Sequence, residues 1–442
     1  MHLPETIYRD PVHNIITMGK SSPDDMLLRS LIDTREMQRL RQVRQLGLAN
    51  FTYQGAEHSR FSHSLGVCWL ATRMVSILSR EYPISPENQL AVRCAALLHD
   101  IGHGPFSHVL ENLTSTPHED WSMRIITDPV TEVNQVLRSV SPEFPETVKN
   151  ILAKKSSPKF LSEIITSQLD ADRFDYLLRD SLMTAVKHGI FDLESILNLL
   201  RVDTDGEHIM LDAYAIHPVE KYLQARYHMF SLVYLHRTVR AAETMLRLIL
   251  KRAKELILAG REDIIAVDTP LYQMLYKDKD LSLQDYLRVN DATIIYYLEL
   301  WEESKDSILS NLARSLFRRR LFKSIDLTNT DDLREKLVNA MNFYEKNNIN
   351  SNYYLALDEI SNLPYKPYDP QNGTSQERKH IMIRTPDGVS EYIDIYDLSP
   401  VVRGLTQASI FTRRVFFPDH INGINLREVL ENLFHGPTAN LF

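Results

Sequence analysis

The most constraining feature of this sequence is a string near residue 100, where an apolar helical pattern runs into a histidine–aspartate pair. The string reads Ala95-Ala96-Leu97-Leu98-His99-Asp100-Ile101-Gly102-His103-Gly104-Pro105-Phe106-Ser107-His108. Apolar helices ordinarily end in a glycine or a polar cap, whereas this one ends in two adjacent residues of the types that bind metal ions. Taken alone, such a pair is more often a solvated helix end than a ligand pair, so the rest of the chain decides between the two.

The composition of the 442-residue chain predicts a soluble, mostly helical protein that is too long for one typical core. Only 14 glycines are present, which favours helix, and the net charge of −8 argues against a nucleic-acid partner. Neither a signal-peptide pattern nor an apolar run of about 18 residues occurs in the sequence. We therefore expect a cytoplasmic protein without a membrane partner.

The hydrophobic periodicity predicts helices over most of residues 27–344. Thr34 is expected to cap the second helix of the segment 27–48. Four further helical regions are expected, at residues 62–82, 87–99, 217–260 and 281–344. The region 217–260 contains no internal glycine or proline before Gly260 apart from Pro218, and it predicts one continuous helix.

Beyond Glu345-Lys346-Asn347-Asn348 the pattern changes to the alternation of β-strands. Strands are expected at residues 353–358, 380–384, 392–395 and 410–417, with a turn at 385–388 between two of them. The fold class predicted is mostly α, with a helical catalytic domain over residues 1–347 and a smaller α+β subdomain over residues 348–442.

Further residues of metal-binding type lie on either side of the histidine–aspartate pair. His63 lies in Arg60-Phe61-Ser62-His63-Ser64-Leu65-Gly66, and Asp172 lies in Asp170-Ala171-Asp172-Arg173-Phe174-Asp175-Tyr176. A metal site needs ligands from several elements, because one helix cannot surround an ion. Mixed nitrogen and oxygen ligands suit Mn, Mg, Fe, Ni or Zn, and the sequence leaves this choice open. A bound cation would polarise a phosphoryl oxygen and lower the pKa of a water molecule.

In this order the motifs resemble those of the HD-domain metal phosphohydrolases. More narrowly, the chain is similar to the deoxynucleoside triphosphate triphosphohydrolases, which include the animal enzyme linked to a sterile-alpha-motif domain and its bacterial relatives. The resemblance covers roughly residues 8–260 and rests above all on the string 99–108. It implies an HD-domain helical core, a divalent metal held by His63, His99, Asp100 and Asp172, and hydrolysis of dNTPs, dGTP included, to deoxynucleoside and inorganic triphosphate.

The resemblance also implies which residues act on the scissile bond. His103, His108 and His118 line the cleavage site in the family. An acid follows the second of these histidines, and here it is Glu111 in place of the usual aspartate. The leaving 5′ oxygen needs a proton, and a histidine beside a carboxylate can supply it. We expect His108 with Glu111 to do so, and His103 and His118 to bind the α-phosphate and orient the water.

Two helical stripes predict a face for the substrate. Asp172, Tyr176 and Asp180 recur at every fourth residue, as do Arg226, Phe230 and Tyr234, so each set lies on one helix face. Stripes of this kind more often reflect ordinary packing of a half-buried helix against its neighbours. The resemblance favours binding instead, and implies substrate contacts from Gln45, Leu46, Arg60, Arg173, Tyr176, Asp180, Arg226, Tyr234 and Arg237. Gln45 would bond the 3′ hydroxyl and Leu46 would crowd the 2′ position, while arginines suit phosphate oxygens. Arg173 stands where the family often has lysine.

A second nucleotide site follows from the resemblance alone. Asp33, Gln38 and Arg41 match the spacing of an activator site that reads a guanine edge in the family, although its upstream lysine is missing and only Arg9 lies nearby. Outside this context the three would be surface residues of an amphipathic helix. The family also implies a homo-oligomer, dimer or tetramer, and allosteric activation by a bound nucleotide.

Three alternatives stay open. The same metal site could act on another nucleotide, although the motifs of cyclic-dinucleotide and alarmone hydrolases are missing around the string 99–108. The protein could instead be an inactive nucleotide-sensing regulatory HD protein. It could also bind nucleic acid through Lys154-Lys155 or Arg318-Arg319-Arg320, although short basic runs of this kind are more often solvated faces.

Overall fold

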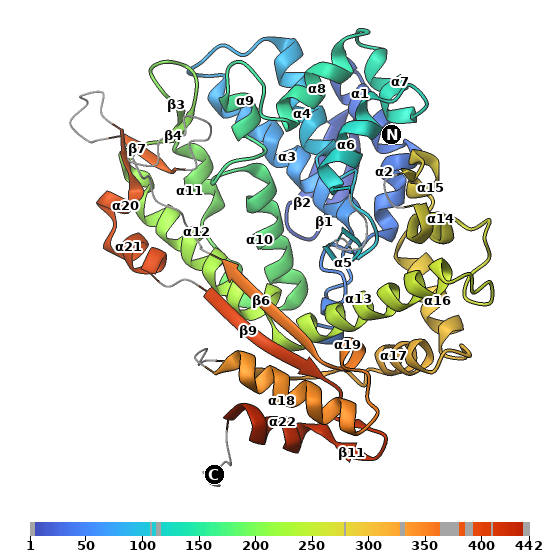
Figure 1. Ribbon diagram of the computed structural model, residues 1–442. Coiled ribbons are helices and arrows are strands. Elements are labelled where there is room, and N and C mark those ends of the chain that lie inside the picture. The colour runs from blue at the N-terminus through green and yellow to red at the C-terminus, as the bar shows by residue number, and fades with distance from the viewer. Residues whose placement is uncertain are drawn as a thin grey trace.

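Helices dominate the computed structural model and share one extended hydrophobic core, so the mostly α class is confirmed (Figure 1). The structure describes residues 5–106, 108–111, 116–277, 280–327, 332–362, 380–384, 392–407 and 410–435, without the side chains of His108, Ser361, Asn362 and Ile410. Within this part of the chain, no helix combines the length and the hydrophobicity that crossing a bilayer would require.

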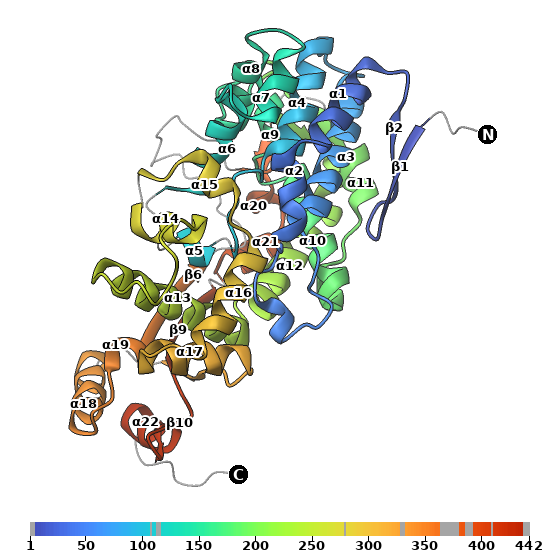
Figure 2. The ribbon, with the colours of Figure 1, turned by 90° about the vertical axis from the view of Figure 1, so that its right-hand side faces the viewer.

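The first part of the core begins with a strand pair and continues as helices. Strand β1 (Glu5–Asp10) pairs antiparallel with β2 (Asn14–Gly19), and the hairpin lies at the outer edge of the molecule (Figure 2). Thr34 caps α2 as predicted, since its hydroxyl accepts a hydrogen bond from the Met37 N–H. The helices that follow are α1 (Pro23–Ile32), α2 (Arg35–Arg39), α3 (Arg60–Leu78), α4 (Pro86–Leu98), α5 (His108–Glu111), α6 (His118–Thr127), α7 (Glu132–Arg138), α8 (Phe144–Leu152), α9 (Phe160–Glu163), α10 (Ala171–Thr184) and α11 (Leu193–Asn198), with short 3-10 turns at Leu40–Gln42, Ala49–Phe51 and Lys187–Gly189.

The prediction of one continuous helix over residues 217–260 is wrong. A 3-10 turn (Ala213–Ala215) leads into α12 (Ile216–Met229), the chain then widens into a π-helical turn (Phe230–Tyr234), and a new helix, α13 (Arg237–Leu258), starts after a cap at His236. The His236 side chain accepts a hydrogen bond from the Thr238 N–H, which ends the first helix and begins the second. The periodicity missed this break because no glycine or proline marks it. As a result, Arg237 stands on a different helix from Arg226.

The later helices pack on α13 and on one another. The region 281–344 contains a strand as well as helices, and the chain runs through α14 (Pro270–Lys277), α15 (Leu283–Leu287), α16 (Asp291–Trp301), α17 (Ser307–Phe317), β5 (Lys323–Asp326) and α18 (Leu333–Lys346). The C-terminal part contributes α19 (Ser351–Tyr354), β6 (Ala356–Asn362), β7 (Met382–Arg384), β8 (Tyr392–Asp394), α20 (Ile395–Leu398), α21 (Pro400–Gln407), β9 (Ile410–Phe417), β10 (His420–Ile421), β11 (Ile424–Asn425) and α22 (Leu426–His435).

The strands form small sheets that join distant parts of the chain. Strand β9 lies between β5 and β6, and β7 pairs in parallel with β4 (Ile209–Leu211), which also pairs with β3 (Leu200–Val202). Strand β6 begins three residues later than predicted, because residues 351–354 are helical. Strands β7 and β8 pair antiparallel as a hairpin would, and the turn predicted at 385–388 lies outside the described residues. A subdomain boundary near residue 347 stays a prediction, and strands from both sides of it pair in two of the sheets.

Candidate metal centre

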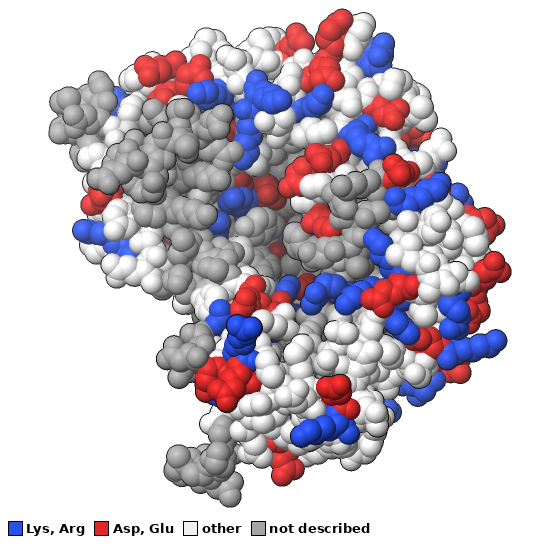
Figure 3. All heavy atoms as spheres, in the orientation of Figure 1, with Lys and Arg blue, Asp and Glu red and all other residues white. Residues whose placement is uncertain are grey.

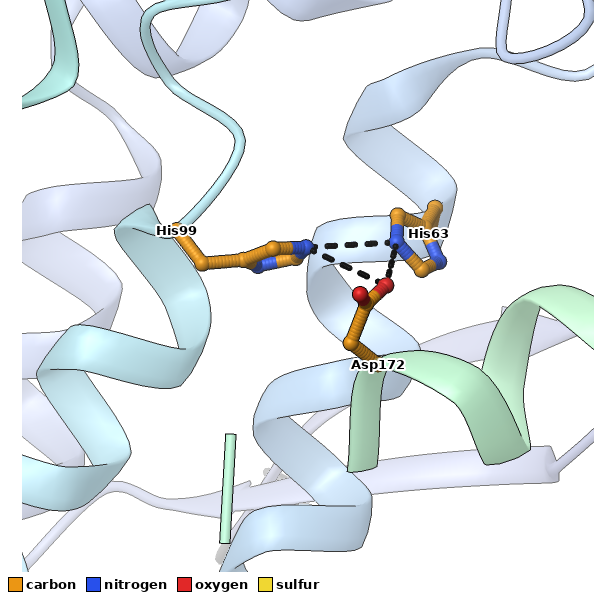
Figure 4. A group of neighbouring side chains, drawn as sticks. All are labelled: His63, His99 and Asp172. Carbon is orange, nitrogen blue, oxygen red and sulfur yellow. Dashed lines mark hydrogen bonds and ion pairs between the residues drawn. The ribbon is translucent and has the colours of Figure 1, made fainter. Parts of the chain in front are cut away.

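Three helices each contribute one side chain to a compact group that consists of His63, His99 and Asp172. His63 lies in the first turn of α3, His99 caps the C-terminus of α4, and Asp172 lies in the first turn of α10. Their side chains point toward one another (Figure 4). The His63 Nε2 lies 3.1 Å from Asp172 Oδ1 and 3.3 Å from His99 Nε2, and His99 Nε2 lies 3.6 Å from Asp172 Oδ1. This group could hold a metal ion.

The hydrogen bonds behind the two imidazoles leave both Nε2 atoms free to bind a cation. His99 Nδ1 lies 2.8 Å from the Ala96 carbonyl oxygen, and His63 Nδ1 lies 2.8 Å from Asp175 Oδ2. Because both partners accept hydrogen bonds, each Nδ1 would keep its proton when a cation is bound, and each Nε2 would then present its lone pair to that cation. Two lone pairs at 3.3 Å beside a carboxylate repel one another unless a positive charge lies between them. The donor set therefore fits a divalent metal.

The pKa shifts agree that this point favours positive charge. Burial alone would lower the pKa of His63, but hydrogen bonds to Asp172 and Asp175 raise it to about 10. The pKa of His99 is also raised, because the charge of Asp100 and the Asp172 carboxylate outweigh its burial.

Asp100, the fourth predicted ligand, lies at the edge of this group. Its Oδ2 accepts a hydrogen bond from Arg60 Nη1 at 2.5 Å and lies 3.7 Å from His63 Nε2. Its Oδ1 lies 3.4 Å from His99 Nε2 and 3.3 Å from His103 Nε2. Although Asp100 is buried, the nearby charges of His99 and Arg60 hold its pKa well below the usual range. A small rotation of this carboxylate would decide whether it joins the group.

A second cluster of ionisable side chains adjoins the first one through Asp100. It consists of His103, Glu111 and His118. The His118 Nδ1 contacts Glu111 Oε1, and the rings of His103 and His118 stack with their centroids 3.7 Å apart. Burial and the Arg60 charge lower the pKa of His103 to about 3, so its imidazole is neutral near pH 7. The two clusters in contact place a group that could hold a metal ion beside a histidine–carboxylate pair.

Glycine at position 102 lets these clusters meet. A Cβ atom at Gly102 would lie 2.2 Å from the His118 carbonyl oxygen and 2.3 Å from the Ser122 N–H nitrogen. The Gly102 N–H donates a hydrogen bond to Ser122 Oγ at 3.0 Å, which fixes the start of α6 against the loop after α4. The Gly102 position in the string 99–108 therefore reflects close packing that brings His118 to His103. The side chain of His108 lies outside the described structure, so its role with Glu111 stays a prediction.

Several of the predicted substrate residues lie together on α10, on α12 and in the π-helical turn that follows α12. Tyr234 donates a hydrogen bond to Asp180 Oδ2 at 2.8 Å, and its ring centroid is 6.2 Å from that of Tyr176. Burial raises the pKa of Tyr176, and the charges of Arg226, Arg173 and Asp172 also act on its phenol, so these groups face the same region. Figure 3 shows a face of the molecule that is hollowed near its middle, with basic and acidic side chains in the hollow.

Two arginines of the predicted substrate face have protein partners, whereas the side-chain oxygen of Gln45 has none among the described residues. Arg226 Nη1 donates to Gln168 Oε1 at 2.7 Å, and Arg173 Nη1 donates to Asp170 Oδ2 at 3.3 Å. The Gln45 Oε1 is buried and has no described hydrogen-bond donor. Leu46 is half-buried against the hydrophobic core. An oxygen such as Gln45 Oε1 would gain a partner from a substrate hydroxyl.

Arg237 does not lie with this group in the described structure. It lines another cleft of about 340 Å³, none of whose lining residues belongs to the metal centre. The cleft is polar, and its cationic members are Arg237, Arg319, Lys323 and Arg427. A contact from Arg237 to the same substrate as Arg226 stays a prediction.

The predicted regulatory residues lie on the surface around α1 and α2. Gln38 Nε2 donates to the Ile32 carbonyl at 2.8 Å, and Arg41 Nε donates to Gln38 Oε1 at 2.8 Å. The Arg41 guanidinium lies 3.7 Å above the centroid of the Phe61 ring in α3, two residues from His63. Asp33 is exposed at the end of α1. The structure joins Gln38 to Arg41 directly and places Asp33 at the adjoining helix end.

The sequence reasoning missed the residues that support the ligands from behind. Asp175 binds His63, and it is bound in turn by Arg179 in the same helix and by His13 of the N-terminal hairpin. The spacing of Asp175 and Arg179, four residues apart on a helix, is a local signal for their ion pair. No local pattern connects His13 to residue 175.

Comparisons with known proteins show what this chain is similar to. Residues 60–180 match the HD domain family, and they include His63, His99, Asp100 and Asp172. The chain is 38% identical to the protein YwfO of Bacillus subtilis (strain 168) over 94% of its own length and 92% of that protein. It is 29% identical to the deoxynucleoside triphosphate triphosphohydrolase SAMHD1 homolog of Dictyostelium discoideum, over 53% of this chain and 48% of that protein.

A solved structure extends the similarity to the whole fold. The crystal structure of a phosphohydrolase from Bacteroides thetaiotaomicron VPI-5482 superposes with a TM-score of 0.79 at 29% identity, and covers 93% of this chain and 99% of that one. An HD-domain match, similarity to dNTP triphosphohydrolases and a phosphohydrolase with the same fold agree with the metal-binding geometry described above. The chain therefore belongs to the same family as YwfO, a family of HD-domain proteins, and is similar to dNTP triphosphohydrolases over part of its length.

Proposed function

We propose that this protein hydrolyses deoxynucleoside triphosphates to the deoxynucleoside and inorganic triphosphate. The observation that carries the proposal is the meeting of the His63, His99 and Asp172 group with the His103–His118–Glu111 cluster, next to the face that bears Arg226 and Tyr176. The similarity to named triphosphohydrolases supports the choice of substrate, although the alignment covers about half or less of those proteins.

In the proposed reaction a water molecule attacks the α-phosphorus, and the bond between that phosphorus and the 5′ oxygen breaks. A divalent cation held by His63, His99 and Asp172 would polarise the phosphoryl oxygen and make the water a better nucleophile. Arg60 and Arg226 would bind the phosphate oxygens. The leaving 5′ oxygen takes a proton from a histidine beside a carboxylate. Both His118 with Glu111 and the predicted pair of His108 with Glu111 fit this role.

At the sugar end, Asp180, Tyr234 and Gln45 would read the deoxyribose. Asp180 is fixed by hydrogen bonds with Tyr234 and with His58 Nε2 at 2.7 Å, which leaves it oriented as an acceptor. Leu46 would crowd a 2′ hydroxyl, so the ribonucleotide would bind less well. Discrimination of this kind relies on steric exclusion and on one well-placed acceptor.

The test is direct product analysis. Purified protein with Mn²⁺ or Mg²⁺ is incubated with each of the four dNTPs, and the products are separated by ion-exchange chromatography. We expect deoxynucleoside and inorganic triphosphate from the wild type, and neither from His99→Ala or Asp172→Ala. The variant His188→Ala removes an exposed histidine outside the clusters and serves as the control. Release of pyrophosphate with a monophosphate, or no turnover of any dNTP, would refute the proposal.

A second site for an activating nucleotide is favoured by the basic cleft of about 340 Å³. Its positive charge comes from Arg237, Arg319 and Lys323, and none of the three forms an ion pair with a carboxylate among the described residues. Thr238 and Ser324 add hydroxyl groups to the lining. Only Arg427 is paired, with Glu431. Such a lining suits a polyphosphate. The base could be read by Asp33, Gln38 and Arg41 of a neighbouring subunit, which would couple activation to a homo-oligomer.

Activation is tested with a non-guanine dNTP as substrate, with and without added dGTP or GTP, while light scattering reports the oligomer. The proposal predicts that both the rate and the oligomer size increase on nucleotide addition. It also predicts that Lys323→Glu removes the increase. A rate and a size that do not depend on any added nucleotide would refute it.

A further inference from the structure

The turn of the N-terminal hairpin is built to carry His13 into the interior. Asp10 ends β1, and its Oδ1 accepts hydrogen bonds from the Val12 N–H at 2.8 Å and the His13 N–H at 2.9 Å. Asn14 follows with a positive φ of 62° and begins β2. These bonds fix the turn, and the His13 side chain is only 5% exposed although the hairpin lies at the edge of the molecule (Figure 2).

The imidazole of His13 reaches the carboxylate that holds a proposed metal ligand. His13 Nε2 lies 2.6 Å from Asp175 Oδ1, and the other oxygen of the same carboxylate lies 2.8 Å from His63 Nδ1. The chain of contacts therefore runs from His13 through Asp175 to His63, and ends at the Nε2 that faces the metal-binding group. The side chain of Asp175 is fully buried, so its orientation depends on these partners.

A buried arginine completes the arrangement from the opposite side. Arg179 donates from Nε to Asp175 Oδ2 at 2.7 Å and from Nη2 to Asp175 Oδ1 at 2.9 Å, while its Nη1 donates to Asp10 Oδ2 at 2.8 Å. Asp10 and Asp175 together carry two negative charges and Arg179 carries one positive charge. The group that contacts His63 Nδ1 directly is the Asp175 carboxylate, and a carboxylate partner makes a ligating imidazole a stronger donor to a cation.

Glycine at position 66 makes room for this set. A Cβ atom there would lie 1.8 Å from Asp175 Oδ1 and 2.6 Å from Arg179 Nη2. Helix α3 thus carries His63 on its first turn and, three residues later, the gap that receives the supporting carboxylate.

We propose that the N-terminal hairpin is part of the metal centre and that His13 is a positioning residue for His63. Through Asp175, His13 orients the His63 imidazole and strengthens its bond to a divalent cation. Asp10 supports the same arrangement in two ways. It accepts a hydrogen bond from Arg179, which holds Asp175, and it fixes the turn that carries His13. This inference rests on the proposed hydrolase centre, and it extends that centre to a segment outside the matched HD domain, which begins at residue 60.

The test compares metal affinity in three variants at position 13, with Co²⁺ as the probe. His13→Leu removes the contact with Asp175, His13→Gln keeps an N–H donor at about the same reach, and His13→Asn is too short to restore it. Metal-free protein is titrated calorimetrically, and the visible absorption spectrum of bound Co²⁺ reports the ligand geometry. Loss of a supporting partner typically weakens metal affinity about 10- to 100-fold. We expect this loss and an altered spectrum in the leucine and asparagine variants, and near wild-type behaviour in the glutamine variant.

His208→Leu is the matched control. His208 Nδ1 lies 2.6 Å from Glu163 Oε1, so the variant also removes a half-buried histidine–carboxylate pair, but neither residue contacts the metal-binding group. We expect this control to change the thermal stability of the metal-free protein and to leave Co²⁺ affinity and spectrum unaltered.

Two results would overturn the inference, and they are distinguishable. If the wild type binds Co²⁺ and the three His13 variants bind it with the same affinity and spectrum, His13 serves the fold alone. If His13→Leu does not fold, the comparison of the glutamine and asparagine variants decides, and equal affinity in those two has the same meaning. If the wild type binds no divalent metal, the proposed function itself is refuted and this inference with it.

Discussion

The hydroxyl of Tyr286 donates a hydrogen bond to the carbonyl oxygen of Gly102 over 2.5 Å, although 184 residues separate the two in the chain. Two further contacts hold the same loop. The Asp291 carboxylate accepts hydrogen bonds from the Phe106 N–H at 3.1 Å and from the Arg44 N–H at 2.9 Å, and both Arg39 Nη atoms donate to the His103 carbonyl at 2.8 Å. The loop that presents His103 is thus fixed by residues outside the HD domain itself.

Replacing Tyr286 by phenylalanine should therefore impair catalysis more than binding. The ring can still stack on Trp121, whose centroid is 4.0 Å away, but the buried Gly102 carbonyl loses its donor, which costs about 1–3 kcal/mol of stability. Because small displacements of reacting groups are costly, we expect kcat for the phosphohydrolase reaction to fall about tenfold or more with little change in KM. The control is Tyr344→Phe, which removes an equivalent buried bond to the Tyr354 carbonyl at 2.9 Å far along the chain. Equal kcat losses in both variants would show that the effect is only one of stability.

Gly66→Ala should destabilise the protein severely. The added Cβ would lie 1.8 Å from Asp175 Oδ1, and this carboxylate is fixed by Arg179 and His13 and cannot withdraw. Overpacking of this kind costs about 3 kcal/mol or more in the free energy of unfolding, measured by urea denaturation. Gly404→Ala is the control, because a Cβ there meets nothing within 4 Å and lies in helix α21, where alanine is favoured by up to about 1 kcal/mol. If Gly66→Ala lowers the free energy of unfolding no more than Gly404→Ala does, the close packing of Gly66 against Asp175 would be contradicted.

Removing divalent metal should lower the melting temperature. The facing Nε2 atoms of His63 and His99 lie 3.3 Å apart beside Asp172, and a shared cation relieves their repulsion. A metal present at 100 times its dissociation constant stabilises the folded state by about 2.7 kcal/mol, which raises Tm by several degrees. Scanning fluorimetry with a chelator, and then with added Mn²⁺, measures the shift. His99→Ala should show no metal-dependent shift in Tm. If the Tm of the wild type changes with neither the chelator nor Mn²⁺, the result would argue against the site.

The two cysteines should be unreactive in the folded protein. Burial raises the pKa of the Cys68 thiol to about 11, although Arg93 lowers it slightly, and burial holds the pKa of Cys94 well above its usual value. A raised pKa keeps the thiol protonated, so at pH 8 little of either cysteine is present as the reactive thiolate. Ellman's reagent should therefore detect no thiol in the native protein at pH 8 and two in guanidinium. Rapid labelling of the native protein would contradict this burial.

Much of the helical fold could be predicted from local pattern. The apolar repeat placed α3 and α4 to within a few residues. Thr34 could be identified as a cap because its hydroxyl accepts a hydrogen bond from a backbone N–H only three residues later. The break at Leu235 and His236 was missed, because it is made by a π-helical turn and a histidine cap that hydrophobic periodicity does not register. Strands β3 and β4 were missed as well, since three residues are too few to show alternation, and the sheet they join is completed by β7 and β8 from far along the chain.

The sequence by itself determined the chemistry of the candidate centre. The histidines, carboxylates and arginines in the motifs around His63, His99 and Asp172 carry their ligand and charge properties wherever the chain places them, and helical spacing put Asp172, Tyr176 and Asp180 on one face. Only the tertiary structure decided what supports and shapes these groups. The contacts of His13, Asp175, Tyr286 and Asp291 join residues 112 to 247 positions apart in the chain, and they exist only after packing has brought these segments together. Local sequence cannot contain them, because the free energy that fixes each carboxylate or carbonyl comes from a partner on a different element.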